Sequence, residues 1–239
     1  MPIINIPLSD RQEVADDTMA FWFDLKGQEL HYLAGQSGDF TIPQLPNPDT
    51  KGATRTFSLA QAENGKTVMV ATRMRSSAFK NYWRDMPLGS VVQLSGPMGN
   101  MVLHEDVKRP AVFLAGGIGI TPFRAMVEAA TLKQLPHRIT LFYSNRTRGS
   151  IAFYDDFVNW ATQNKNFRFV PTLTDDVPPD WPFARGLIGP EMLQRYLPDL
   201  AAPIYYIAGP PAMVTGVQGT LTALGISRDN IRSEDFSGY

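Results

Sequence analysis

The stretch LAGGIGITPF, residues 114–123, decides the fold. An apolar run over residues 111–115 leads into glycines at positions 116, 117 and 119. A strand that enters such a cluster before a helix is the pattern of dinucleotide-binding loops, whose fingerprint is G-x-G-x-x-G. This chain has Pro122 where that fingerprint has its third glycine. The stretch alone leaves open a damaged fingerprint, an ordinary strand-to-helix turn and a different nucleotide site.

Pro122 itself predicts the start of a helix. Thr121 suits the N-cap, and proline suits the first helical position, where its missing N–H has no helical partner. We therefore expect a helix over residues 122–133. A free helix N-terminus after glycines attracts anions through its unpaired N–H groups and its dipole. A tight turn without a ligand is an equal alternative.

Strand-like and helix-like runs alternate in the second half of the chain, which is typical of a parallel sheet with helical crossovers. The expected strands are 111–115, 139–144, 167–173 and 204–208. The expected helices are 122–133, 153–164, 190–197 and 211–224.

The first half contains short runs rich in β-branched and aromatic residues, separated by Gly, Pro, Asn or Asp, and this spacing predicts an antiparallel barrel or sandwich. The expected strands are 18–25, 39–45, 54–60, 66–74 and 90–96, with one helix at 77–86. The rhythm changes at the charged link EDVKRP, 105–110. We place the domains at 1–107 and 108–239.

The composition limits the classes of function. Of the 239 residues 44% are apolar and 19% charged, as in soluble globular proteins, and the net charge of −1 gives no sign of a nucleic-acid partner. The absence of cysteine excludes a disulfide, a thiolate zinc site and an all-cysteine iron–sulfur cluster, and the three widely separated histidines offer no metal-ligand spacing.

The N-terminus lacks a secretory pattern. Residues 200–227 are uncharged but interrupted by Pro and Gly, so we expect a buried strand and helix, no membrane span and a cytoplasmic protein.

The stretch YYIAGPPAM, 205–213, has a strand that ends at Ala208–Gly209, after which Pro210–Pro211 open another helix. Ligands of open parallel sheets sit beyond the carboxyl ends of the strands. Two strands that end in small residues would leave a crevice for a flat ring. Simple helix capping is the alternative.

The stretch YSNRTR, 143–148, follows the next strand and supplies Ser144, Arg146 and Arg148. Arginine forks suit phosphate, although a solvated basic turn has the same composition.

In RTFSLA, 55–60, strand alternation places Arg55 and Phe57 on one face and Thr56 and Ser58 on the other. An arginine beside an aromatic ring suits a phosphate and a stacked ring. A core position for Phe57 is the alternative.

The order of these motifs resembles the ferredoxin–NADP reductase superfamily, and the resemblance covers nearly the whole chain. RTFSLA is similar to its R-x-Y-S motif, GGIGITP (116–122) to its G-G-x-G-x-x-P loop and AGPPAM (208–213) to C-G-P-x-x-M. GQSGDFTI (35–42) and GPMGN (96–100) match its remaining flavin-site elements. The resemblance implies an N-terminal antiparallel flavin-binding β-barrel, followed by a parallel-sheet α/β nicotinamide-binding domain.

The resemblance also implies roles for barrel residues. Arg55 would contact flavin phosphate, Phe57 would flank the isoalloxazine, and Ser58 would hydrogen-bond near flavin N5. The other cofactor-binding candidates of the barrel are Thr56, Arg73 and, for the pyrophosphate at a helix N-terminus, Ser76 and Ser77.

In the second domain the resemblance implies three groups of binding residues. The dinucleotide pyrophosphate would lie on Gly117, Gly119, Thr121 and Pro122. The 2′-phosphate of NADPH would lie on Ser144, Arg146 and Arg148, and the nicotinamide would lie against Gly209 and Pro210. In the C-terminal SEDFSGY, Glu234 would lie near the flavin edge, and Phe236 or Tyr239 would cover the ring. Ser58, Glu234 and Tyr239 are the catalytic candidates.

Two residues depart from the family pattern, because Phe57 replaces a tyrosine and Ala208 replaces a cysteine. The cofactors carry the hydride chemistry, so these changes bear on rate and flavin potential rather than on reaction type. We expect an NAD(P)H-dependent flavoprotein reductase that holds FAD rather than FMN, with NADPH favoured over NADH. Its electrons would pass to a ferredoxin- or flavodoxin-type protein, an oxygenase component or a small acceptor. The alternative function is a non-catalytic regulatory or sensor module that binds flavin or dinucleotide.

Overall fold

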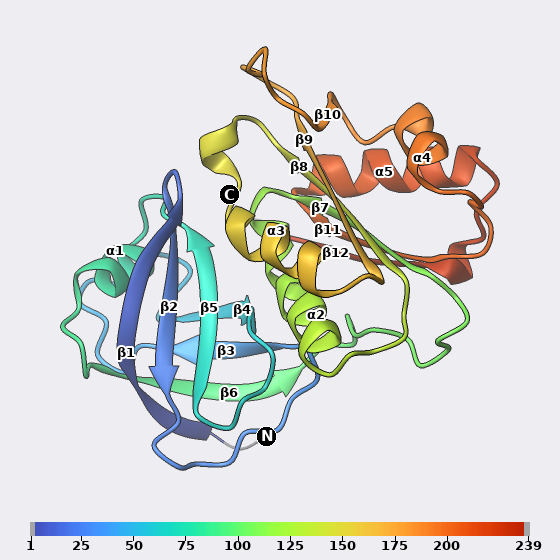
Figure 1. Ribbon diagram of the computed structural model, residues 1–239. Coiled ribbons are helices and arrows are strands. Elements are labelled where there is room, and N and C mark those ends of the chain that lie inside the picture. The colour runs from blue at the N-terminus through green and yellow to red at the C-terminus, as the bar shows by residue number, and fades with distance from the viewer. Residues whose placement is uncertain (1–2, 237–239) are drawn as a thin grey trace.

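The computed structural model describes residues 3–236, which form an antiparallel and a parallel sheet of six strands each (Figure 1). The antiparallel strands are β1 (Ile3–Ala15), β2 (Thr18–Asp24), β3 (Ser37–Thr41), β4 (Thr54–Ser58), β5 (Thr67–Arg73) and β6 (Val91–Met98). The parallel strands are β7 (Ala111–Gly116), β8 (Ile139–Asn145), β9 (Phe167–Leu173), β10 (Ala184–Arg185), β11 (Ile204–Gly209) and β12 (Ile231–Asp235). The predicted fold class is confirmed. The boundary proposed at residue 107 lies between β6 and β7.

The antiparallel sheet has the strand order β4-β3-β6-β1-β2-β5 and curls into a barrel. Its two edges meet where the Ala60 N–H donates to the Met69 carbonyl at 2.8 Å. Helix α1 (Ala78–Asp85) covers one end of the barrel and buries Phe79 and Trp83 in its aromatic core. Strand β1 was not predicted from the sequence. Apolar side chains alternate with polar ones only in its first half, where Ile6 and Leu8 are buried.

The parallel sheet has the order β10-β9-β8-β7-β11-β12 and is covered on both faces. Phe113 faces the apolar cluster of α2 (Ile120–Leu132) and α3 (Tyr154–Gln163). Its neighbour Leu114 faces the cluster of α4 (Pro190–Tyr196) and α5 (Pro211–Ala223). This alternation follows from the two-residue period of a strand. The sequence missed the short edge strand β10 and the C-terminal strand β12.

The uncharged stretch 200–227 forms β11 and α5. The strand is buried throughout, as expected, but the helix buries only one face, through Val214, Val217 and Leu221. The expectation of a buried helix was therefore wrong, because uncharged Thr, Gln and Gly occupy its outer face. Across residues 3–236, none of the helices has both the length and the apolar character that crossing a membrane requires.

The barrel and the parallel sheet share one apolar cluster. Ala60 and Met69 of the barrel pack in it with Ile120, Phe123 and Met126 of α2. Helix α2 therefore lies between the two sheets, and its position depends on both (Figure 1).

Candidate functional site

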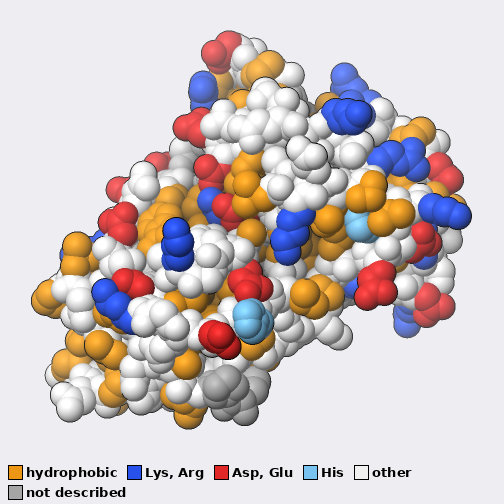
Figure 2. Space-filling view, turned by 60° about the horizontal axis from the view of Figure 1, so that its bottom comes forward, with side chains coloured by type: hydrophobic (Ala, Val, Ile, Leu, Met, Phe, Trp, Pro, Cys, Tyr) orange, Lys and Arg blue, Asp and Glu red, His pale blue; other side chains and the backbone are white. Residues whose placement is uncertain are grey.

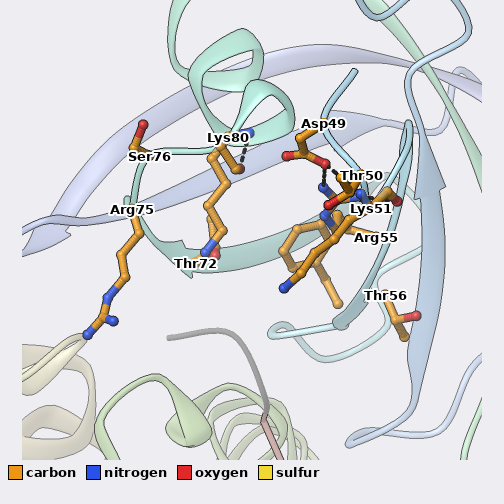
Figure 3. Close-up of a pocket in the computed structure, with 11 residues that line it drawn as sticks. Asp49, Thr50, Lys51, Arg55, Thr56, Thr72, Arg75, Ser76 and Lys80 are labelled. Carbon is orange, nitrogen blue, oxygen red and sulfur yellow. Dashed lines mark hydrogen bonds and ion pairs between the residues drawn. The ribbon is translucent and has the colours of Figure 1, made fainter. Parts of the chain in front are cut away.

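A basic pocket lies between α1 and the loop that precedes β4, with a volume of about 290 Å³ (Figure 3). We call it the basic pocket, and its lining consists of Asp49, Thr50, Lys51, Arg55, Thr56, Phe57, Thr72, Arg75, Ser76, Ser77 and Lys80. Of the predicted flavin-site residues, it brings together Arg55, Thr56, Phe57, Ser76 and Ser77. Four cationic side chains face one carboxylate in this lining, so the pocket has the chemistry of an anion site.

Arg55 is fixed in this pocket by the loop beside it. Its Nη2 donates to Asp49 Oδ1 at 2.8 Å, and its Nη1 donates to the carbonyls of Lys51, Gly52 and Thr54 at 2.8–2.9 Å. The guanidinium also lies over the Phe79 ring at 5.3 Å. The side chain is thus held in one orientation before any ligand arrives.

Lys80 shows the electrostatic character of the pocket most directly. The pKa of Lys80 is lowered to about 8, mainly by burial and then by the nearby positive charges of Arg75, Arg55 and Lys51. Its Nζ donates to the Arg73 carbonyl at 2.7 Å. A bound anion would offset these like charges, so the donor set fits the pyrophosphate of a flavin nucleotide.

The start of α1 forms the upper wall of the same pocket. Ser77 is the N-cap, and its hydroxyl accepts a hydrogen bond from the Lys80 N–H at 3.2 Å. Phe57 lines the pocket, and its ring also stacks on the ring of Trp83, with the two ring centres 4.9 Å apart. The core interpretation of Phe57 therefore describes its contact with Trp83, and its contact with a flavin ring stays a prediction.

A second pocket, of about 230 Å³, lies where the barrel meets the carboxyl ends of the parallel strands. We call it the glycine pocket, and its lining consists of Thr18, Arg73, Gly116, Gly117, Ile118, Ser144, Asn145, Arg146, Ser150, Ala152, Thr174, Leu187, Pro210 and Met213. Gly117, Ser144, Arg146 and Pro210 were predicted from the sequence for this region, whereas Arg73 was predicted among the barrel residues of the flavin site and lies here instead. Gly119 and Gly209, also predicted, are not part of the lining. The pocket therefore joins stretches of the barrel and of the parallel-sheet domain that are remote in the chain.

The two glycine-rich loops touch through their backbones. A Cβ added to Gly119 would lie 2.3 Å from the Ala208 carbonyl oxygen, and one added to Gly116 would lie 2.1 Å from Met213 Sδ. Gly117 instead has φ +51° and an open side, which leaves its backbone accessible. This cradle fits a ligand that approaches the backbone closely, as a dinucleotide does.

The helix after this loop begins earlier than the sequence predicted. Helix α2 starts at Ile120 with Gly119 as its N-cap, after a 3₁₀ turn over 117–119. Thr121 is not the N-cap, since its hydroxyl donates to the Ile118 carbonyl at 3.1 Å. Thr121 and Pro122 lie buried in the first turn, where a proline still costs no helical hydrogen bond. They support the loop from behind, and neither lines the glycine pocket.

The residues proposed for a 2′-phosphate separate in the structure. Ser144 and Arg146 line the glycine pocket, and Arg146 Nε donates to Asp175 Oδ2 at 2.8 Å on the surface. Arg148 lines a different hollow together with Asp156. Asn145 is buried beside the Tyr143 hydroxyl, so it supports the wall of the glycine pocket rather than offering a free donor to a ligand.

The end of β5 contributes one residue to each pocket. Thr72 lines the basic pocket, and the next residue, Arg73, lines the glycine pocket. Lys80 of the first pocket donates to the Arg73 carbonyl. Because consecutive strand residues point in opposite directions, one strand end serves both pockets.

The C-terminal strand reaches the same region. In the register of β11 and β12, Glu234 pairs with Ala208, and the Phe236 N–H donates to the Gly209 carbonyl at 2.9 Å. Burial raises the pKa of Glu234, and the charge of Asp235 raises it further. Ser58 is buried at the end of β4, and Gly209 lies against Gly116. Tyr239, a predicted catalytic and ring-covering residue, lies outside the described residues.

Sequence reasoning missed several lining residues. Lys51, Arg75 and Lys80 add to the cationic character of the basic pocket, and the run RMRSSAFK (73–80) around the helix start was an available signal. Leu187 enters the glycine pocket from the segment between β10 and α4, and its sequence carries no comparable signal. Met213 enters it from the first turn of α5; the motif AGPPAM contains it, but no role was assigned to it.

Comparison with known proteins gives two family matches. Residues 5–103 match the oxidoreductase FAD-binding domain, and residues 113–219 match the oxidoreductase NAD-binding domain. The chain is also similar in fold to the FAD/NAD-binding domain of nitric oxide dioxygenase from Vibrio cholerae, with a TM-score of 0.85 over 98% of each chain at 19% identity.

Two curated relatives share sequence with most of the chain. One is a component of the Na(+)-translocating NADH-quinone reductase of Yersinia pestis, which is 35% identical over 85% of this chain and 54% of its own length. The CDP-6-deoxy-L-threo-D-glycero-4-hexulose-3-dehydrase reductase of the same species is 29% identical over 87% of this chain and 60% of its own length. The chain thus spans little more than half the length of these relatives.

Proposed function

Since the chain belongs to the FAD- and NAD-binding oxidoreductases of the ferredoxin–NADP reductase superfamily, we propose that it is an NAD(P)H-dependent flavoprotein reductase. The observation that carries this proposal is that the consecutive residues Thr72 and Arg73 line the basic pocket and the glycine pocket, respectively. FAD held there would supply the redox chemistry: NAD(P)H would lose a hydride and become NAD(P)⁺, the two electrons would pass on to the acceptor, and the proton would go to solvent or to the acceptor. The protein's task is to hold two flat rings in contact and to keep water from competing.

The basic pocket supports the placement of the flavin. Arg55, Lys80 and the α1 N-terminus at Ser77 would hold the pyrophosphate, which is the reason to favour FAD over FMN. Phe57 and Ser58 continue along β4 from that pocket and would contact the ring system. The backing of Phe57 by Trp83 would keep its ring from turning.

The glycine pocket supports the placement of the pyridine nucleotide. The backbone of Gly117, with the first turn of α2 behind it, would hold the pyrophosphate. The region of Gly209 and Pro210 would face the nicotinamide. Glu234 beside Ala208 would then lie near the reacting rings, where its raised pKa suits a group that holds a proton.

We propose NADPH as the favoured donor, because Ser144 and Arg146 line the glycine pocket and an arginine fork suits a 2′-phosphate. In the structure Arg146 pairs with Asp175. Binding of NADPH would therefore require Arg146 to exchange this carboxylate for the phosphate. NADH has no 2′-phosphate and would leave the ion pair intact. The ratio of the two nucleotide affinities therefore measures the free energy of exchanging Asp175 for the phosphate.

The electron acceptor would be a separate molecule. The two curated relatives are by name reductases of a sugar-nucleotide dehydrase and of a quinone. This chain has no cysteine to hold an all-cysteine iron–sulfur cluster of its own. On the described part of the face in Figure 2, acidic and basic side chains are interspersed with apolar ones, which suits a small acceptor or a transient protein contact better than a polyanion.

The experiment is a reduction assay on the purified chain. FAD and FMN are titrated separately, NADPH or NADH is then added without oxygen, and the bleaching of the flavin is followed. Ferredoxin, flavodoxin, haem protein, quinone and ferric chelate are then offered as acceptors. Reduction followed by reoxidation supports the proposal. Flavin that binds but is reduced by neither nucleotide would support the regulatory alternative, and absence of flavin binding would reject the reductase.

A further inference from the structure

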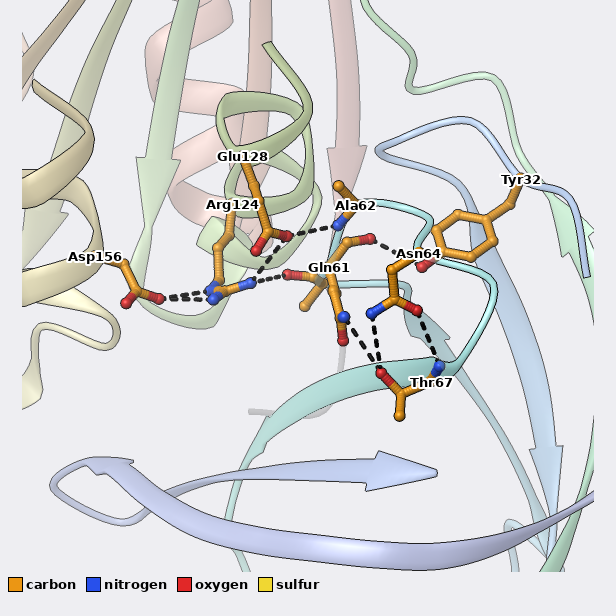
Figure 4. Close-up of polar contacts among 9 residues, drawn as sticks. Tyr32, Gln61, Ala62, Asn64, Thr67, Arg124, Glu128 and Asp156 are labelled. Atoms are coloured by element: carbon orange, nitrogen blue, oxygen red, sulfur yellow. Dashed lines mark hydrogen bonds and ion pairs between the residues drawn. The ribbon is translucent and has the colours of Figure 1, made fainter. Parts of the chain in front are cut away.

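A buried polar cluster joins α2 to the barrel, apart from both pockets (Figure 4). Arg124 of α2 donates through Nη1 to the Ala60 carbonyl at 2.7 Å. One turn later Glu128 accepts the Ala62 N–H at 2.6 Å. Ala60 and Ala62 belong to the barrel, so both bonds cross between the two domains.

Arg124 is also held from within its own domain. Its Nε and Nη2 donate to Asp156 Oδ2 of α3 at 3.0 and 2.7 Å. Its guanidinium lies 4.7 Å from the centre of the Phe153 ring and 5.2 Å from that of Trp160. Its side chain is only 10% exposed. The arginine therefore has one well-defined orientation, and its remaining Nη1 is directed at the barrel.

The barrel side of the cluster is equally well held. Tyr32 donates to the Gln61 carbonyl at 3.1 Å, and Gln61 Nε2 donates to Thr67 Oγ1 at 3.3 Å. The Ala60 N–H closes the barrel onto Met69. The loop 60–62 cannot shift without disturbing the strands on both sides of it.

The chain positions of these contacts connect them to the two pockets. The loop 60–62 directly follows RTFS of β4, which carries Phe57 and Ser58. Arg124 and Glu128 lie one and two turns into α2, the helix that directly follows the glycine loop 116–118 on the wall of the glycine pocket. The cluster thus links the proposed flavin strand to the proposed nucleotide loop through two short, rigid segments.

We propose that Arg124 and Glu128 are positioning residues, which clamp α2 to loop 60–62 and so fix the nicotinamide site relative to the flavin site for hydride transfer. This inference rests on the proposed function. Neither residue lines the basic pocket or the glycine pocket, so neither would contact a reacting atom there. Their effect would be geometric, and misplacement of reacting groups by about 1 Å can cost about 10²-fold in rate.

The test compares single-turnover reduction of the flavin-loaded chain by saturating nucleotide in wild type, Arg124→Met, Arg124→Lys and Glu128→Gln. The matched control is Arg168→Met, because Arg168 also donates to a backbone carbonyl and lies over a ring, but only within the parallel-sheet domain. Rate and amplitude are recorded separately. A purely structural loss lowers the amplitude through unfolded protein, whereas altered geometry lowers the rate of the folded fraction.

We expect the rate to fall about tenfold or more in Arg124→Met, with partial recovery in Arg124→Lys and no change in Arg168→Met. Nucleotide deuterated at the transferred position should show a primary isotope effect in the slowed variant, because hydride transfer then limits the rate. Should wild type fail to reduce flavin, the proposed function itself is wrong. Should wild type reduce flavin while folded Arg124→Met and Glu128→Gln react at the same rate, the clamp is refuted and the reductase proposal stands.

Discussion

Gly119→Ala is the substitution whose effect the structure defines most sharply. The added Cβ would lie 2.3 Å from the Ala208 carbonyl oxygen, 2.4 Å from its carbon and 2.6 Å from the Gly209 nitrogen. All three atoms are backbone of a buried strand, so no side chain can move aside. The start of α2 and the end of β11 must separate by roughly 1 Å in an interior that is otherwise close-packed.

Overpacking of this kind costs about 1–3 kcal/mol. For a chain of this length each kcal/mol lowers the melting temperature by about 2–4 °C. The same separation moves the nucleotide loop, so we expect flavin reduction to slow by up to about 10²-fold. Thermal denaturation and single-turnover reduction measure the two effects.

The control is Gly216→Ala, the same chemical change in the interior of α5. Nothing lies within 4 Å of the added Cβ there, and the glycine has an ordinary helical φ. Alanine should stabilise this helix by about 0.5–1 kcal/mol. If Gly119→Ala proved as stable and as fast as Gly216→Ala, the contact of the two loops would not exist as described.

The charged groups give three further predictions. Lys80→Met should weaken flavin binding about ten- to a hundredfold, because the variant loses one charge-assisted hydrogen bond. Titration at several pH values should show that the flavin affinity of the wild type falls as pH rises above about 8, where Lys80 loses its proton, and that the affinity of the variant does not. Asp175→Asn frees Arg146 and should improve the affinity for NADPH about two- to fivefold, as expected of an exposed pair, with NADH unchanged in calorimetry. Burial lowers the pKa of His104, so this histidine binds a proton more readily in the unfolded chain than in the folded one. The free energy of unfolding should therefore fall as pH drops below about 6.5. Urea denaturation should show a smaller fall in His104→Asn.

The sequence predicted those parts of the fold whose signal is local. The strands and helices of the parallel domain that it predicted agree with the structure to within two residues, because apolar runs, prolines and glycines mark their ends. The start of α2 was misplaced by two residues, since a close approach to Ala208, invisible in the sequence, makes Gly119 the cap. Strand β1 was missed because its second half is an exposed ribbon without apolar alternation.

The site divides in the same way. Arg55 and Gly117 are found from motifs, because each lies in a short stretch with a chemical reason of its own. Asp175 acquires its meaning only from Arg146, which lies at the end of another strand, and Arg73 lines a pocket formed mainly by the other domain. Arg148 resembles Arg146 in sequence, yet it lines another hollow, because the 3₁₀ turn at 148–150 turns it away.

The central claim is that the two pockets hold a flavin and a pyridine nucleotide in reacting contact. The most direct measurement adds NADPH, and in parallel NADH, to the FAD-loaded chain without oxygen and follows the visible absorbance of the flavin. We predict complete bleaching in a single turnover, with one nucleotide oxidised for each flavin reduced. Flavin that stays oxidised under saturating concentrations of both nucleotides would contradict the account.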